Sequence, residues 1–216
     1  MSAVPVFKIR DKVSALTHFT ALVAAIFAMP ALLIHAAANG ADKTALISLS
    51  VFMLSMVFLY AASTAYHSFQ LSPMGCRRLK KLDHIMIFYL IAGTYTPVCI
   101  IALGNMWLLA LVWALALVGT VFKLCWVTCP KWVSSVIYIA MGWSCLSAMP
   151  QILATLSRVG FLWLLVGGLA YTVGGVIYAI KPKSLRKRLF GPHEIFHIFV
   201  MTGSLCHYVF MYFHIV

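Results

Sequence analysis

The chain has 216 residues, of which 63% are hydrophobic and only 9% are charged. A water-soluble domain is usually about a quarter charged and about half apolar, so this composition excludes a soluble globular protein and requires lipid around most of the surface. The formal net charge is +12, but the basic residues stand in short runs between apolar stretches, which favours contact with lipid headgroups over nucleic-acid binding.

Seven stretches are apolar and long enough to cross a bilayer as helices. In chain order they are residues 18–38, 44–66, 82–103, 106–124, 133–154, 161–180 and 193–215. The first follows a basic segment and ends in three alanines, as a signal peptide would, but its apolar run is long for a signal peptide and we expect it to remain as a span. The sequence therefore predicts an all-α integral membrane protein, a seven-helix bundle formed as one domain by residues 1–216.

Basic residues gather on one side of this predicted bundle. All 16 Lys and Arg except Lys43 and Arg158 fall in the N-terminal tail or in and beside the second, fourth and sixth connections. Cytoplasmic loops of membrane proteins carry an excess of Lys and Arg. We therefore expect the N-terminus in the cytoplasm and the C-terminus outside.

Polar side chains inside membrane spans are costly, so each is a candidate for function. Ser63 and His67 come late in the second span, Asp83 opens the third, and His193 and His197 open the seventh. The predicted topology brings these three span ends to the cytoplasmic side. The five side chains are thus expected at one depth, near the inner leaflet.

Their spacing suits a metal site. Side chains four residues apart share one face of a helix, so His193 and His197 can reach one ion, and Ser63 and His67 repeat this spacing. Three imidazoles with one open position form a typical catalytic zinc set, and they favour Zn²⁺ over Mg²⁺ or Ca²⁺. We predict that His67, His193 and His197 bind Zn²⁺, with Asp83 holding a water or orienting a ligand. The alternative is that they are unrelated interfacial histidines, satisfied by backbone carbonyls or headgroups.

Several motifs are recognisable at and around these residues. They are Ser63-Thr-Ala-Tyr-His67-Ser, Leu82-Asp83-His84, Ile91-Ala-Gly-Thr-Tyr-Thr-Pro97, Ala140-Met-Gly-Trp143, His193-x-x-x-His197 and Gly203-Ser-x-Cys-His207. From about Asp11 to the C-terminus the sequence resembles the bacterial hemolysin III family, which is related to the progestin and adipoQ receptors, including the adiponectin receptors. The resemblance implies a seven-helix protein of the bacterial inner (plasma) membrane, with zinc held near the inner leaflet.

The resemblance also implies roles for single residues. His67, His193 and His197 would be the zinc ligands, and Asp83 would hold the metal-bound water with Ser63 beside it. The family usually opens with Glu-x-x-Asn-x-x-x-His, and the matching positions here are Asp11, Ser14 and His18, so only the histidine is retained. The roles of these three residues stay open, and His18 is either interfacial or a support for the site.

A second motif overlaps the last histidine pair. His193-Glu194-x-x-His197 matches the metalloprotease pattern H-E-x-x-H. No further acid or histidine follows it at a suitable distance, so a protease is disfavoured. We expect Glu194 to be a charge at the cytoplasmic edge.

Three functions follow from these observations. The first is a zinc-dependent hydrolase of lipid amides or esters, comparable to the alkaline ceramidases of the wider superfamily, with Asp83 and Ser63 as catalytic residues. The second is a sensor or regulator of membrane homeostasis that zinc stabilises. The third is a pore or cytolysin, as the family name suggests, but no ring of acids or carbonyl motif marks an ion filter. Membrane lipids are the expected partners in each case; nucleic acid is not expected, and the oligomeric state is left open.

Overall fold

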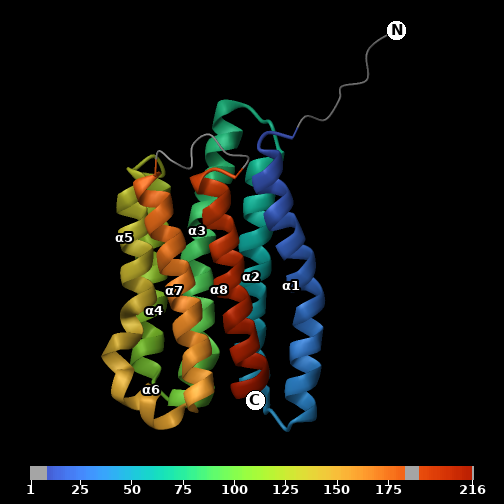
Figure 1. Ribbon diagram of the computed structural model, residues 1–216, viewed down its shortest axis with the longest axis vertical. Helices are drawn as coiled ribbons and strands as arrows, with labels where there is room; N and C mark the ends of the chain where they lie inside the picture. Colours follow the sequence, from blue (N-terminus) through green and yellow to red (C-terminus); the bar gives the residue numbers. More distant parts are fainter. Residues whose placement is uncertain (1–8, 183–189, 216) are drawn as a thin grey trace.

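The computed structural model describes residues 9–182 and 190–215, and within them it contains helices and no strand. Seven helical stretches of this part are long and apolar enough to cross a membrane, which confirms the predicted fold class. The elements are α1 (Lys12–Ala38), α2 (Lys43–Ser68), α3 (Pro73–Pro97), η1 (Val98–Leu103), α4 (Met106–Cys125), α5 (Lys131–Gly142), η2 (Trp143–Ala148), α6 (Met149–Thr155), α7 (Arg158–Ile180) and α8 (Pro192–His214). The long helices stand side by side as an upright bundle, and we call the end at which α1 begins the upper end (Figure 1).

Two helices begin earlier than the apolar pattern predicts. α1 begins at Lys12 rather than at residue 18, so the polar positions before residue 18 belong to the bundle. α3 begins at Pro73 rather than at residue 82, because the Ser72 side chain caps it by accepting from the Gly75 backbone N–H and proline suits the first helical position. The basic segment between the second and third spans is therefore mostly helical. Hydropathy marks only the apolar part of each helix, so it misses these polar first turns.

The fifth predicted span is a broken helix. The α-helical hydrogen bonding of α5 ends at Gly142, a 3₁₀ stretch covers Trp143–Ala148, and α6 completes the crossing. The Tyr95 hydroxyl from α3 lies at the break, where it donates to the Gly142 carbonyl at 2.6 Å and accepts from the Cys145 N–H at 2.8 Å. A side chain thus satisfies backbone groups that the interrupted helix leaves free, as the membrane interior requires.

Small residues let the helices approach closely. A Cβ added at Gly174 of α7 would lie 2.7 Å from Phe199 Cβ of α8, and one at Gly119 of α4 would lie 2.5 Å from the Phe88 ring of α3. Large apolar side chains such as Trp107 and Phe27 point outward instead, with 89% and 73% of their surface exposed. Backbones packed through glycine inside and apolar side chains outside are the arrangement expected in lipid.

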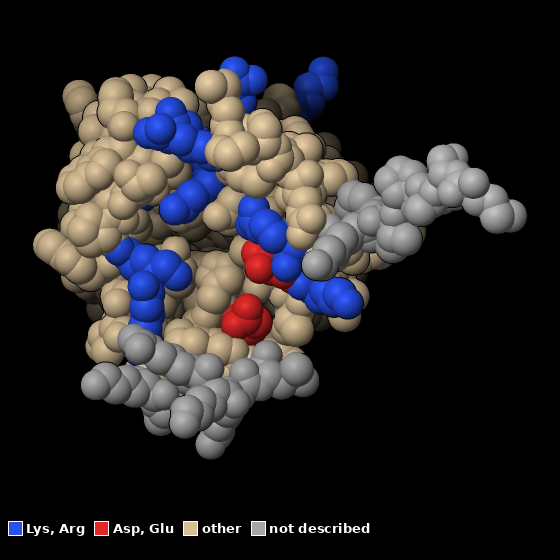
Figure 2. Space-filling view, turned by 90° about the horizontal axis from the view of Figure 1, so that it is seen from above, with Lys and Arg blue, Asp and Glu red and all other residues tan. Residues whose placement is uncertain are grey.

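The described basic residues follow the predicted charge asymmetry. Figure 2 shows Lys and Arg side chains spread over the upper face, with acidic side chains near its middle. Lys43 and Arg158 begin helices that start at the opposite end. Lys8, Lys183, Arg186, Lys187 and Arg188 lie outside the described residues. The cytoplasmic placement of the upper end stays a prediction.

One basic residue of this end is buried. Lys123 is fully buried, and its ammonium donates to Ser134 Oγ at 2.6 Å and to Cys129 Sγ at 3.2 Å. Lys123 therefore joins α4 to the start of α5 rather than reaching lipid headgroups.

The close approach of α2 and α3 can be tested at Gly93. A methyl group there would lie 2.7 Å from Ser55 Cβ and 3.3 Å from the Val51 carbonyl oxygen. We expect Gly93→Ala to cost about 1–3 kcal/mol of stability, because the two helices must separate, and to lower the thermal unfolding midpoint of the purified protein in detergent. Gly168→Ala is the matched control, since a methyl group there meets nothing within 4 Å. An unchanged midpoint for Gly93→Ala would contradict this packing.

Candidate metal centre

The start of α1 is tied to the end of α2 by backbone hydrogen bonds. The Asp11 N–H donates to the His67 carbonyl at 2.9 Å, and the Arg10 N–H donates to the Ser68 carbonyl at 3.3 Å. This link holds the Asp11 carboxylate beside the His67 ring, with Oδ2 3.1 Å from Nδ1. Arg10 Nε donates to the same oxygen at 3.0 Å.

The Asp11 side chain is ionised beside His67 and Arg10. Partial burial raises the pKa of Asp11, but the hydrogen bonds from His67 and Arg10 outweigh burial, and the pKa lies below its usual value. The carboxylate accepts from Nδ1–H of His67 and leaves Nε2 of that ring as the nitrogen with a free lone pair. Asp11, which stands where the family usually has Glu, thus orients the His67 ring.

The predicted histidines meet at the upper end of the bundle. His67 of α2 faces His193 and His197 of the first two turns of α8, and one ring nitrogen of each lies within 4.8 Å of the others. The Nε2 atoms of His67 and His193 are 3.1 Å apart, although the residues are separated by 126 positions. His67 and His197 are only 2% and 1% exposed. These three side chains could hold a metal ion.

The third ring is oriented from α1. Nδ1 of His197 lies 3.2 Å from Thr17 Oγ1, and that hydroxyl donates its proton to the Ser14 carbonyl at 3.0 Å. Because the proton of Thr17 is already used, its oxygen accepts from Nδ1–H of His197. His197 therefore also keeps Nε2 as an unprotonated donor atom.

The spacing of the donor atoms fits a tetrahedral metal. Metal–nitrogen bonds of about 2.0–2.1 Å place two ligand nitrogens roughly 3.3 Å apart, close to the 3.1 Å between Nε2 of His67 and Nε2 of His193. The second nitrogen of His193, Nδ1, is buried and has no hydrogen-bond partner among the described residues. Imidazole nitrogens that face one another in this way are suited to a shared cation.

Ser14 and His18, which stand with Asp11 at the positions of the family's opening motif, also lie beside the histidine cluster. Ser14 Oγ donates to Glu194 Oε1 at 2.9 Å, and Glu194 Oε2 accepts from the Gly191 N–H at 3.0 Å. Glu194 therefore caps α8 and joins it to α1, which is more than the edge charge expected. The His18 ring stacks on His197 with ring centroids 3.6 Å apart and an interplanar angle of 7°, and His18 is 3% exposed, so it packs against the histidine cluster inside the bundle.

Asp83 and Ser63 line the same cavity as the three histidines. They share a side-chain hydrogen bond, and Asp83 is 9% exposed. Asp83 Oδ2 lies 3.8 Å from Nδ1 of His84, and that nitrogen lies 2.7 Å from the Lys80 carbonyl. The five side chains predicted at one depth therefore surround one space, while the catalytic roles of Asp83 and Ser63 stay predictions.

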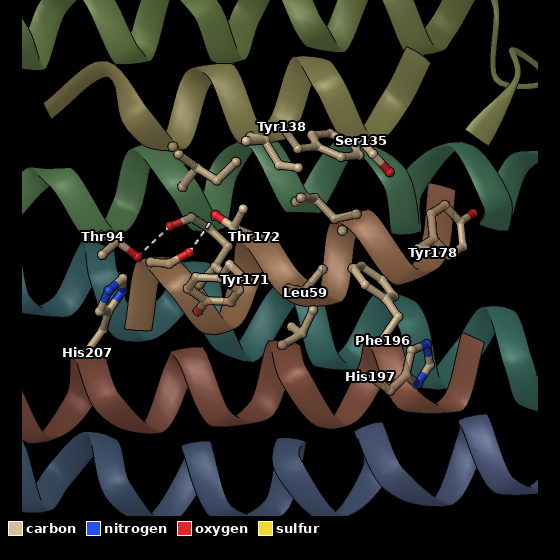
Figure 3. A pocket seen from close by; sticks show the side chains of 18 of the residues that line it. Leu59, Thr94, Ser135, Tyr138, Tyr171, Thr172, Tyr178, Phe196, His197 and His207 are labelled. Atoms are coloured by element: carbon tan, nitrogen blue, oxygen red, sulfur yellow. Dashed lines mark hydrogen bonds between the residues drawn. The ribbon is translucent and has the colours of Figure 1, made fainter. Parts of the chain in front are cut away.

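The cavity extends far beyond the histidines. Its volume is about 470 Å³, and its wall is mainly apolar, with residues such as Leu59 and Phe196. Figure 3 shows His197 on one side of the view and His207 and Thr94 on the other. The size is that of a small-molecule site, and its length follows the bundle.

Thr17 contacts the histidine cluster, and its position was not predicted from the sequence. Ser14, Thr17 and His18 stand at spacings of three and four and so share one face of α1. A polar stripe of this kind in an otherwise apolar span is the signal that could have identified it.

Comparisons with known proteins identify the family of this chain. A family model described as haemolysin-III related matches residues 8–208. Hemolysin-3 of Bacillus cereus is 37% identical over 194 residues, covering 88% of this chain and 85% of that protein. The Hemolysin-3 homolog of Bacillus subtilis (strain 168) is 36% identical over 202 residues, covering 92% and 91%.

The contact between Asp11 and His67 predicts an effect on metal affinity. We expect Asp11→Asn to weaken Zn²⁺ binding by about 10–100-fold, because the amide is a poorer acceptor for the ligand's Nδ1–H. Competition between the purified protein and a coloured chelator measures this. Asp42→Asn is the matched control, since Asp42 caps α2 at the opposite end and asparagine caps equally well. Equal affinities in both variants would show that Asp11 does not support the metal.

Proposed function

Because this chain belongs to the haemolysin III family of multi-pass membrane proteins, we propose that it binds Zn²⁺ through His67, His193 and His197 and hydrolyses an amide or ester bond of a membrane lipid. The observation that carries the proposal is the joint placement of the three imidazoles, an acid and an apolar cavity in one space. Imidazole ligands favour Zn²⁺ over the oxygen-seeking Mg²⁺ and Ca²⁺. When bound, zinc supplies Lewis acidity that polarises a carbonyl and makes water a better nucleophile near neutral pH.

Asp83 is the proposed general base and acid. Its carboxylate takes a proton from the attacking water and returns it to the leaving amine or alcohol. Ser63, hydrogen-bonded to it, holds the carboxylate in place. Asp11 and Thr17 have a different task, since each fixes the tautomer of a ligand ring through Nδ1.

The cavity is the proposed lipid site. Its apolar middle, with residues such as Leu59, Leu90 and Val200, suits an acyl chain, and the histidine end suits the carbonyl group. Lys80 and Lys131 also line it. A chain threaded in this way presents its carbonyl at the depth of the histidines and keeps its tail among apolar side chains.

We place the protein in the bacterial inner membrane with the upper end in the cytoplasm. The support is the gathering of Lys and Arg on that end (Figure 2) and the positive-inside rule. The metal centre then lies near the inner leaflet, where lipid carbonyls are concentrated.

A non-enzymatic regulator is the second candidate. The cluster joins α2 to α8, and Asp11 and Thr17 of the first segment hydrogen-bond to it, so a metal there would also tie three helices together. In this alternative zinc contributes stability and no lipid is cleaved.

The catalytic role of Asp83 can be measured directly. We expect Asp83→Asn to lower the turnover of a fluorescent ceramide or phospholipid by about 10²–10⁴-fold, because proton transfer is lost, while the zinc content stays at the wild-type value. Asp42→Asn should leave turnover unchanged. If zinc-loaded wild type cleaves no lipid amide or ester, the hydrolase proposal fails and the regulator stands.

A further inference from the structure

A second buried polar cluster lies at the upper end, apart from the metal centre and its cavity. It consists of Lys123 of α4, Cys129 of the connection to α5, and Ser134 of α5. The Lys123 Nζ donates to Ser134 Oγ at 2.6 Å and to Cys129 Sγ at 3.2 Å, and the sulfur lies 3.2 Å from the hydroxyl oxygen. The exposed fractions of the three residues are 0%, 8% and 4%. An amine and a thiol, both nucleophilic when deprotonated, are therefore in direct contact inside the protein.

The Lys123 side chain has no carboxylate beside it. None of the ion pairs found in the described part of the chain includes this residue. A buried ammonium without an opposite charge is costly, and the acidic group in contact with it is the Cys129 thiol. Loss of one proton makes the pair neutral overall, with the shared proton on nitrogen or on sulfur. Ser134 suits both forms, because its oxygen accepts from nitrogen and its proton can be donated to sulfur.

The local backbone holds the nitrogen and the sulfur at reacting distance. The Cys129 N–H donates to the Trp126 carbonyl at 3.4 Å, which turns the connection back towards α4. The Ser134 N–H donates to the Pro130 carbonyl at 3.4 Å at the start of α5. Reacting atoms in a near-attack geometry are about 3–3.5 Å apart, and the separation of Nζ and Sγ is 3.2 Å. A bond between them therefore requires no movement of a helix.

The thiol lies just below the surface of the upper end. Its chain neighbours Thr128 and Pro130 are exposed, and Cys129 itself is 8% exposed. A small oxidant such as hydrogen peroxide needs only a narrow opening to reach the sulfur from this side. Peroxides oxidise a cysteine thiolate to a sulfenic acid, which condenses readily with a neighbouring nucleophile.

We propose that Lys123 and Cys129 form a reversible sulfenamide cross-link when a hydroperoxide oxidises the thiol. In the first step the O–O bond of hydrogen peroxide breaks, an S–O bond forms and one water leaves, so the sulfur is oxidised and the peroxide is reduced. In the second step the uncharged Lys123 amine attacks the sulfur, the N–S bond forms, the S–O bond breaks and a second water leaves. One thiol, one amine and one peroxide thus give one sulfenamide and two waters.

The reverse reaction needs an external thiol. Two thiol molecules, such as those of a cellular thiol reductant, return the amine and the Cys129 thiol and leave as a disulfide. The cross-link joins the last turn of α4 to the connection that leads into α5. Lys123 and Cys129 are therefore a modification site for oxidant, and neither zinc nor a lipid takes part in the reaction.

Peptide mass spectrometry of the full-length protein in detergent tests the proposal. The protein is treated with hydrogen peroxide, unfolded and digested with trypsin. We expect loss of tryptic cleavage after Lys123, because the modified amine is no longer recognised. The peptide that contains Lys123 and Cys129 should be lighter by the mass of two hydrogen atoms, and dithiothreitol should restore both the mass and the cleavage.

Three variants assign the cross-link to these residues. Cys129→Ser should lose it, whereas Cys125→Ser, the matched control at an exposed cysteine nearby, should form it as wild type does. Lys123→Arg keeps the charge but offers a poorer nucleophile, so Cys129 should then stop at the sulfenic or sulfinic acid.

The wild-type protein alone already decides the matter if Lys123→Arg does not fold. Peroxide treatment that leaves Lys123 fully cleavable, with Cys129 either unchanged or carrying oxygen, would overturn the proposal. A cross-link that persists in Cys129→Ser would also overturn it, because the sulfur would then belong to another cysteine.

Discussion

Buried polar groups in a membrane protein must find their partners inside the protein, because lipid offers none. Three imidazoles that face one another at one end of this bundle meet that requirement most simply by sharing a cation. Much of the surrounding structure serves their orientation. α1 hydrogen-bonds to the end of α2 through its backbone, Asp11 and Thr17 hold the outer nitrogens of two rings, and His18 covers a third face by stacking.

The same requirement explains the shape of the cavity. One end collects the histidine cluster with Asp83 and Ser63, and most of the remaining lining is apolar. A ligand that fills this space must be mainly apolar and polar at the histidine end, which is the pattern of an acyl chain with its carbonyl group.

The sequence predicts the fold and the meeting of the three histidines well, because both leave local signals. Apolar runs give the spans, and the i, i+4 spacing of His193 and His197, together with the charge-based topology, places His67 beside them. Hydropathy does not predict the helix starts at Lys12 and Pro73; the Ser72 side chain caps the second, whereas the Asp11 side chain makes no cap at the first.

Consequently the hydropathy pattern does not predict the contribution of α1 to the site. The role of Thr17 depends on how α1 turns against α8. Tertiary contacts of this kind leave no pattern along the chain.

X-ray absorption at the zinc edge of the purified protein tests the central claim most directly. We predict one zinc per chain, with three imidazole nitrogens and one further light ligand at about 2.0–2.1 Å, and loss of this zinc in His67→Ala. Sulfur ligands at about 2.3 Å, or zinc retained unchanged in His67→Ala, would contradict it.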